Sequence, residues 1–104
     1  KMVNNVLIAE FMTLPKKLSE KNGNTKYQFK KNWVGVYELG FDVSWDWLMP
    51  VVERIDKYML NLGANTQGDR LAESIFSSLR QVDITLTVNR IVLFIKWYNK
   101  ESEL

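Results

Sequence analysis

A chain of 104 residues with a net charge of +2 fits one domain, and it is long enough to bury a core without metal or disulfide support. Its composition, 46% hydrophobic and 25% charged, is typical of a globular protein and argues against disorder. Because the chain has no cysteine and no histidine, the sequence excludes disulfides, thiolate nucleophiles, histidine-based triads and zinc hydrolases.

The beginning of the chain is predicted to form a short helix followed by a loop. Asn4 or Asn5 can cap a helix that runs through Met12 and that ends before Pro15. Residues 16–26 are polar and include an Asn-Gly pair, which is a turn signal. We therefore expect this segment to be a mobile surface loop.

Two short strands are expected next. Tyr27 and Phe29 alternate with polar residues, and residues 33–39 are rich in aromatic and β-branched side chains. Gly35 weakens the second of these strands. The prediction is a two-stranded element.

A long helix is predicted from Ser44, which is a good N-cap, to Gly63, which ends it. Asp46 lies in the first turn, where a negative charge is favourable, and Pro50 is expected to bend or loosen that turn. Apolar residues recur at steps of three and four along one face, which predicts a buried stripe. The stripe consists of Trp45, Leu48, Val52, Ile55, Met59 and Leu62.

The last part of the chain is predicted to contain two further helices. Residues 65–68 are expected to form a loop, and Asp69 can start a helix that reaches Arg80. Residues 84–89 alternate as a strand would, but Asp83 as a cap favours a helix over residues 84–98. The expected fold is thus a single α+β domain over residues 1–104. It is mostly helical, with two long core helices, a short N-terminal helix and the two-stranded element.

Three blocks of sequence, IAEFM (8–12), SWDWLMPVVERI (44–55) and FIKWYN (94–99), resemble a family of small uncharacterised proteins encoded in phages and prophages of gut bacteria. The blocks cover about a third of the chain. The resemblance implies a phage or prophage context, and it brings no activity, cofactor or catalytic residue with it. The chain departs from the family's pattern at Leu93 and in residues 65–81.

The last helix carries a second apolar stripe, formed by Leu86, Leu93 and Trp97, on nearly the opposite side from its core face. One interpretation is that another element of the same chain covers this stripe. The alternative is an interface, either of a homodimer or with an unidentified host or phage protein, since Leu and Trp rarely form an exposed patch on a monomer. Arg90, Lys96 and Lys100 would form its polar rim.

The pair Trp45 and Trp47, with Met49, could suggest an aromatic ligand box. Helical spacing instead places Trp45 in the core stripe. Trp47 lies off that stripe and is the residue of the pair expected to line a groove or contact a partner.

Basic residues concentrate in the first third of the chain, where seven lysines face two glutamates in residues 1–34. Lysines interleaved with aromatic residues can bind a single nucleic-acid strand. Against this hypothesis, alternation along a strand would place lysines and aromatic side chains on opposite faces. The candidate contacts are Lys16, Lys17, Lys21, Lys26, Lys30 and Lys31.

The acidic residues give no convincing catalytic set. Asp46 and Asp69 suit helix N-termini, and Glu53 with Lys57 has the spacing of an exposed ion pair. No phosphate loop or carboxylate-rich metal motif accompanies the remaining candidates, Glu38, Asp42 and Glu73. We expect a non-enzymatic protein that has no cofactor.

The longest uninterrupted apolar run, residues 91–95, is far shorter than the roughly 18 residues that a membrane span needs. The apolar start of the chain lacks the features of a signal peptide. We therefore expect no membrane contact and a cytoplasmic location.

Overall fold

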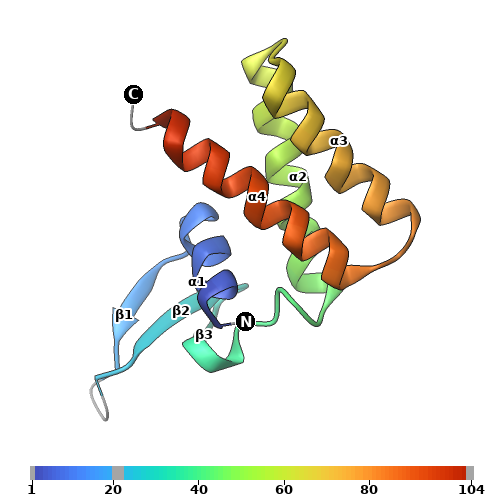
Figure 1. Ribbon diagram of the computed structural model, residues 1–104. Helices are drawn as coiled ribbons and strands as arrows, with labels where there is room; N and C mark the ends of the chain where they lie inside the picture. The colour runs from blue at the N-terminus through green and yellow to red at the C-terminus, as the bar shows by residue number, and fades with distance from the viewer. Residues whose placement is uncertain (1, 20–22, 103–104) are drawn as a thin grey trace.

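Four helices and a three-stranded antiparallel sheet make up the part of the chain that the computed structural model describes, residues 2–19 and 23–102 (Figure 1). The α+β, mostly helical fold class is confirmed. In chain order the elements are α1 (Met2–Phe11), β1 (Lys16–Leu18), β2 (Thr25–Phe29), β3 (Asn32–Gly35), a 3-10 turn (Val36–Glu38), α2 (Trp45–Leu62), α3 (Thr66–Arg80) and α4 (Ile84–Ser102).

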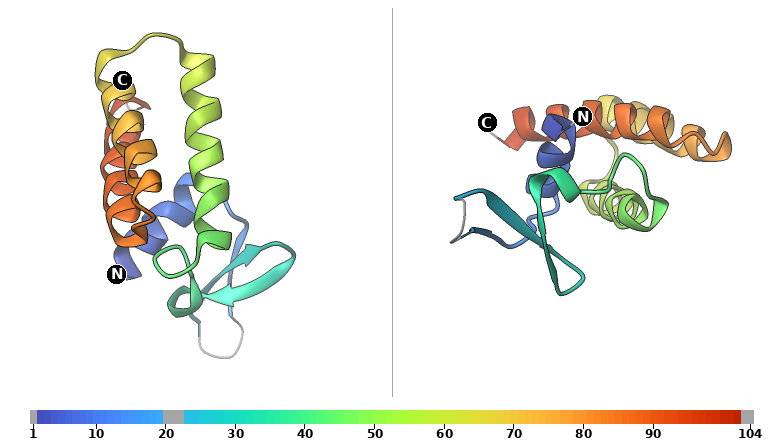
Figure 2. Two further views of the ribbon diagram at one scale, coloured as in Figure 1. Left: turned by 90° about the vertical axis from the view of Figure 1, so that its right-hand side faces the viewer. Right: turned by 90° about the horizontal axis from the view of Figure 1, so that it is seen from below.

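The helices and the sheet occupy different ends of the molecule. Helices α2 and α3 run antiparallel from a shared connection, α4 packs along α3, and the sheet lies near the beginning of α2 (Figure 2). Helix α1 lies between the sheet and α4 (Figure 1). The expected fold had two long core helices, whereas α3, predicted as a helix from Asp69 to Arg80, is a third long helix of 15 residues.

The sheet has one more strand than predicted, because Lys16–Leu18 pairs with β2. All three residues of β1 are exposed, so the segment has no apolar alternation by which a sequence pattern could reveal it. The strand is held in place by hydrogen bonding to β2, and Lys16 lies opposite Tyr27 in this pairing. The predicted loop therefore begins later than expected.

Helix α1 begins at Met2, so neither Asn4 nor Asn5 is its cap and that prediction is wrong. Asn5 is buried within the helix, where its Nδ2 donates to the Leu39 carbonyl at 3.0 Å and to Asp42 Oδ1 at 3.1 Å. A tertiary partner has recruited a side chain that the sequence pattern assigns to capping. These bonds fix α1 against the segment that leads into α2.

Helix α2 begins after Ser44 and ends at Gly63, as predicted, and it continues through Pro50. Gly63 has a φ of 82°, and its N–H donates to the Met59 carbonyl. The buried face of α2 is Leu48, Val51, Val52 and Ile55. The predicted stripe is wrong at its end, because Leu62 is exposed beyond the point where α2 contacts the rest of the core.

Helix α3 begins at Thr66, three residues before the predicted start at Asp69. Asn65 is the cap, and its Oδ1 accepts a hydrogen bond from the Gly68 N–H at 2.9 Å. Asp69 lies in the first turn and accepts from the Asn65 N–H at 3.3 Å. The two side chains thus form a reciprocal cap, which explains the earlier start.

Helix α4 is continuous from Ile84, so the segment that alternates like a strand is helical. Asp83 Oδ1 accepts from the Leu86 N–H at 3.0 Å, which confirms the predicted cap. Ser78 of α3 and Thr87 of α4 are fully buried, and their hydroxyl oxygens lie 2.7 Å apart. This pair links the two helices in the core.

The core is one cluster to which the helices and the sheet both contribute. Its largest fully buried side chains include Phe41, before α2, and Phe94 of α4. Across the described residues, the helices all fall short of the length and hydropathy that a bilayer-spanning helix would have.

Candidate functional site

A groove of about 370 Å³ lies between the start of α3 and the end of α4. Its apolar part comes from Leu71, Leu93 and Trp97, and the remaining lining residues are polar or charged. Leu93 is 56% exposed, so an apolar side chain stands in solvent beside an apolar hollow. The charged and polar lining consists of Gln67, Lys96, Lys100 and Glu101.

Trp97 is the most buried of the residues that line this groove and is only 8% exposed. It sinks into the molecule because Gly68 has no side chain: a Cβ at Gly68 would lie 2.7 Å from Trp97 Cη2. Within the described part of the chain, the indole N–H of Trp97 is buried and has no hydrogen-bond acceptor. Because this nitrogen is inaccessible to solvent, it is an unpaired donor of the interior and not a contact point on the groove surface.

The predicted stripe of Leu86, Leu93 and Trp97 is not one continuous exposed patch. Leu86 is half-buried and lies outside the groove, Leu93 is exposed, and Trp97 is buried. Helix α3 covers part of the stripe, while Leu93 remains accessible. Coverage by another element of the chain thus holds for Trp97, whereas an interface at Leu93 stays a prediction.

Trp47 takes part in internal packing at the junction of α2 and the sheet. Its ring stacks on Phe29 with centroids 3.8 Å apart and meets Phe41 edge-to-face at 5.2 Å. Gly40 allows this approach, since a Cβ there would lie 2.9 Å from the indole. The side chain is half-buried, and its contacts position the sheet against α2.

The outer face of the sheet brings together two of the candidate lysines with Trp33. The register places Lys17 opposite Lys26, and Gln28 opposite Trp33, on the face away from Tyr27. Lys17 Nζ lies 4.2 Å from the centroid of the Trp33 ring, and Trp33 is 38% exposed. A cation and an accessible aromatic ring are therefore adjacent on this surface.

The other lysines of the set are arranged differently. Lys16 lies on the opposite face and forms an ion pair with Glu10 at 3.1 Å. Lys30 and Lys31 form the β2–β3 turn, with φ angles of 49° and 73°. Lys21 lies outside the described residues. The six lysines therefore do not form one surface.

Three of the acidic residues considered for catalysis have structural partners. Glu38 accepts from the Gly35 N–H and Asp42 from Asn5, while Asp69 completes the cap of α3. Among the described residues there is no group of three or more carboxylates arranged for a metal. The expected ion pair between Glu53 and Lys57 is not formed; the one ion pair in the described part of the chain joins Lys16 to Glu10.

Glu10 and Tyr27 form the most perturbed pair of titratable groups. The Tyr27 hydroxyl donates to Glu10 Oε2 at 2.8 Å. This bond, with a smaller contribution from Lys16, lowers the pKa of Glu10. Burial, together with the same bond, raises the pKa of Tyr27 to about 12. The pair joins α1 to the inner face of the sheet.

Comparison with known proteins finds no matching family model, no matching curated protein and no matching solved structure. The functional interpretation therefore depends on the surfaces described above. The part of the groove that the sequence did not reveal is its α3 wall, Gln67 and Leu71. An isolated glycine inside a helical pattern, Gly68, was the available indication of close packing there.

Proposed function

We propose that this chain is a non-enzymatic accessory protein that acts through protein contacts, and that the α3–α4 groove is its contact surface. The observation that supports this most is the exposed side chain of Leu93 beside the apolar hollow that Leu71 and Trp97 line. Aromatic anchors next to accessible apolar side chains are typical of contact surfaces. A phage or prophage origin and a cytoplasmic location, as expected from the sequence, belong to the same proposal.

The occupant that we propose for the groove is a second copy of the chain. A two-fold interface requires a surface that complements itself. The groove offers both an accessible apolar side chain, Leu93, and an apolar hollow beside Trp97, and its rim carries both signs of charge, Lys100 and Glu101. Leu93 of each copy can therefore enter the hollow of the other, with Lys100 near the opposite Glu101.

The dimer is expected to be weak. A standard stable interface uses roughly 20 to 30 residues on each side. Seven residues line the groove. Because this is only a fraction of a standard interface, we expect dissociation constants of roughly micromolar to millimolar.

The experiment is the solution mass by gel filtration with light scattering over a concentration series, for the wild type, Leu93→Lys and Leu60→Lys. Leu60 is a matched control, since it is 76% exposed on α2 and lies outside the groove. We expect the masses of the wild type and Leu60→Lys to rise toward a dimer, and Leu93→Lys to remain monomeric with unchanged thermal stability. A wild type that stays monomeric at the highest concentration would refute self-association, and unfolding of Leu93→Lys would assign Leu93 to the core.

A second candidate function, nucleic-acid binding, is favoured by the outer face of the sheet. Lys17 and Lys26 flank the accessible Trp33 there, and the turn at Lys30 and Lys31 adds two charges at the edge. This combination matches a surface on which a base stacks and lysines contact phosphates.

The test is the affinity for single-stranded DNA as a function of salt. If phosphates are neutralised at these lysines, affinity falls steeply with salt, and Lys30→Gln with Lys31→Gln lowers the slope by about one to two. Lys16→Gln is the control, because Lys16 is paired with Glu10 on the other face. Retention that hardly depends on salt would reject this candidate.

A further inference from the structure

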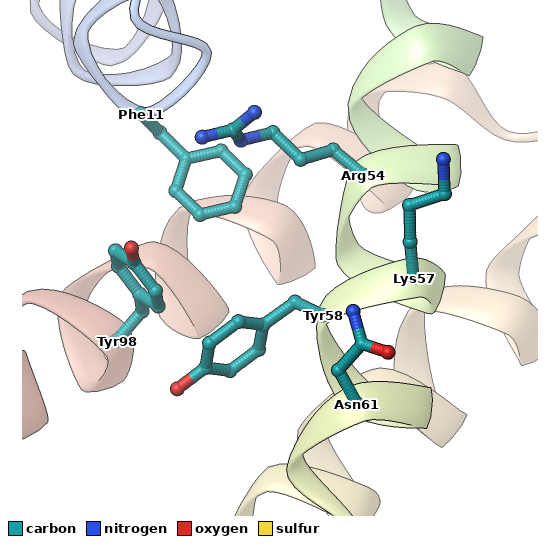
Figure 3. Close-up of a pocket in the computed structure, with 6 residues that line it drawn as sticks. All are labelled: Phe11, Arg54, Lys57, Tyr58, Asn61 and Tyr98. Atoms are coloured by element: carbon teal, nitrogen blue, oxygen red, sulfur yellow. The ribbon is translucent and has the colours of Figure 1, made fainter.

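A hollow of about 180 Å³ opens where three helices meet, away from the α3–α4 groove. Phe11 comes from α1, Tyr98 from α4, and the remaining side chains from α2 (Figure 3). The lining residues are Phe11, Arg54, Lys57, Tyr58, Asn61 and Tyr98. The hollow therefore draws on segments that are distant in the sequence.

Aromatic rings form the inner side of this hollow. Tyr98 meets Phe11 edge-to-face with centroids 5.1 Å apart, and it meets Tyr58 at 5.0 Å. Phe94 lies behind them, 6.4 Å from both Phe11 and Tyr58. These contacts hold the rings of Phe11, Tyr58 and Tyr98 in place. They leave open the hollow that the three rings line, and a further ring can pack there.

The outer side of the hollow carries positive charge. The Arg54 guanidinium carbon lies 5.5 Å from the centroid of the Phe11 ring, so the cation stands beside the aromatic cluster (Figure 3). Lys57 is one turn further along α2. Neither cation forms an ion pair with a carboxylate of the described residues, and no acidic residue lines the hollow.

Neutral polar groups complete the lining. In the described part of the chain, the hydroxyl groups of Tyr58 and Tyr98 and the side-chain amide of Asn61 make no hydrogen bond to protein. Hydrogen-bond donors of this kind can bind an oxyanion together with a guanidinium. The hollow thus combines ring surfaces with donors and unpaired cations.

We propose that this hollow binds a small aromatic acid, a single ring that carries a carboxylate. The ring would pack against Phe11, Tyr58 and Tyr98, and the carboxylate would be held by Arg54 and Lys57. The volume selects the size of the ligand: cavities of about 150 Å³ accept benzene, whereas drug-sized ligands need roughly 300 Å³ or more. At 180 Å³, a ring with one anionic group fits, and an intact nucleotide does not.

The test is a titration of the isotope-labelled protein with benzoate, followed by NMR chemical shifts. Benzamide, the uncharged analogue, and acetate, the anion without a ring, are the matched probes. For so small a ligand we expect an affinity of roughly millimolar, with the largest shifts at Phe11, Arg54, Tyr58 and Tyr98. Benzamide and acetate should each bind at least about tenfold more weakly.

Two variants separate the site from general attraction by charge. Arg54→Gln should weaken benzoate binding by about tenfold, and Arg80→Gln, which removes an exposed charge on α3, should leave it unchanged. If Arg54→Gln loses the dispersed spectrum of the folded protein, Lys57→Gln provides the same comparison. The proposal is overturned if benzoate causes no shifts, if the shifts lie elsewhere, or if benzamide or acetate binds as well as benzoate. None of these results depends on whether the chain forms a dimer.

Discussion

Gly68 illustrates how a single residue sets the distance between two helices. A side chain there would meet Trp97 at 2.7 Å and Met59 Cε at 2.9 Å. Helix propensity alone predicts that alanine stabilises this position by about 1 kcal/mol. Met59 Cε is the end of a flexible side chain and can move, but the Trp97 ring is rigid and only 8% exposed, so overpacking of about 1–3 kcal/mol should exceed that gain.

We therefore expect Gly68→Ala to lower the free energy of unfolding, measured by urea denaturation. Ser77→Ala is the control, since Ser77 is exposed on the same helix and should be unchanged or slightly more stable. Stabilisation by Gly68→Ala would show that Trp97 is not held against α3.

The turn between β2 and β3 stores conformational strain at two lysines. Lys30 and Lys31 both have positive φ, a region in which a two-residue hairpin turn favours an Asn-Gly pair. The double substitution Lys30→Asn with Lys31→Gly should therefore raise the free energy of unfolding by about 1 kcal/mol, measured by urea denaturation.

Lys30→Gln with Lys31→Gln is the matched control for charge in that experiment, because it removes both cations and keeps the strain. It should leave stability nearly unchanged. Equal stability of the two double variants would contradict the assignment of strain to this turn.

The bond between Tyr27 and Glu10 makes stability depend on pH at both ends of the scale. The pKa of Tyr27 is raised from 10.0 to about 12, so its contribution is complete below pH 10 and is lost as the pH rises through 12. The pKa of Glu10 is lowered from 4.5, so its contribution is present above pH 4.5 and is lost as the pH falls through the lower, folded value.

Tyr27→Phe should therefore cost about 1 kcal/mol near neutral pH, an amount reduced by the partial exposure of Glu10. The difference in unfolding free energy between the wild type and Tyr27→Phe should shrink between pH 10 and 12. Urea denaturation at several pH values measures it. A difference that stays constant across this range would mean that the hydroxyl is not the titrating group.

At the scale of elements, α3 and α4 are joined in the core by the hydroxyl groups of Ser78 and Thr87. Both groups also approach backbone carbonyls, those of Ile75 and Asp83. Because each hydroxyl has one hydrogen, the two groups cannot each donate to a carbonyl and also to one another. The bond between them therefore competes with local bonds and is worth about 1 kcal/mol.

A double-mutant cycle with Ser78→Ala and Thr87→Val isolates this link. We expect a coupling energy of about 0.5–1.5 kcal/mol, measured by urea denaturation of the four proteins. Additive effects of the two substitutions would show that each hydroxyl acts only within its own helix.

The elements predicted well are those specified by local signals. Asp83 and Gly63 mark helix ends through their own hydrogen bonding and backbone angles, so the sequence reveals α4 and the end of α2. The strand β1 and the burial of Asn5 depend on partners far along the chain, and no local pattern reports them. The same difference applies to function: the sequence places Leu93 and Trp97 on one apolar stripe, but which of them is exposed depends on α3.

At the scale of the whole molecule, the candidate surfaces have no lining residue in common and can be changed separately, although α4 contributes to two of them. The groove belongs to α3 and α4, the basic face to the sheet, and the aromatic hollow to α1, α2 and α4. The aromatic hollow escaped prediction because its residues lie on three helices that only the folded chain brings together. Substitutions at Leu93, at Lys30 and Lys31, and at Arg54 therefore test three independent statements about one fold.

The central claim is that the α3–α4 groove of one copy receives Leu93 of another. The most direct measurement is an isotope-filtered NMR experiment on a mixture of labelled and unlabelled protein, which detects only contacts between copies. We expect contacts from the Leu93 methyl groups to the Trp97 indole and the Leu71 methyl groups of the other copy. The absence of contacts between copies at high concentration, or contacts confined to other surfaces, would contradict the account.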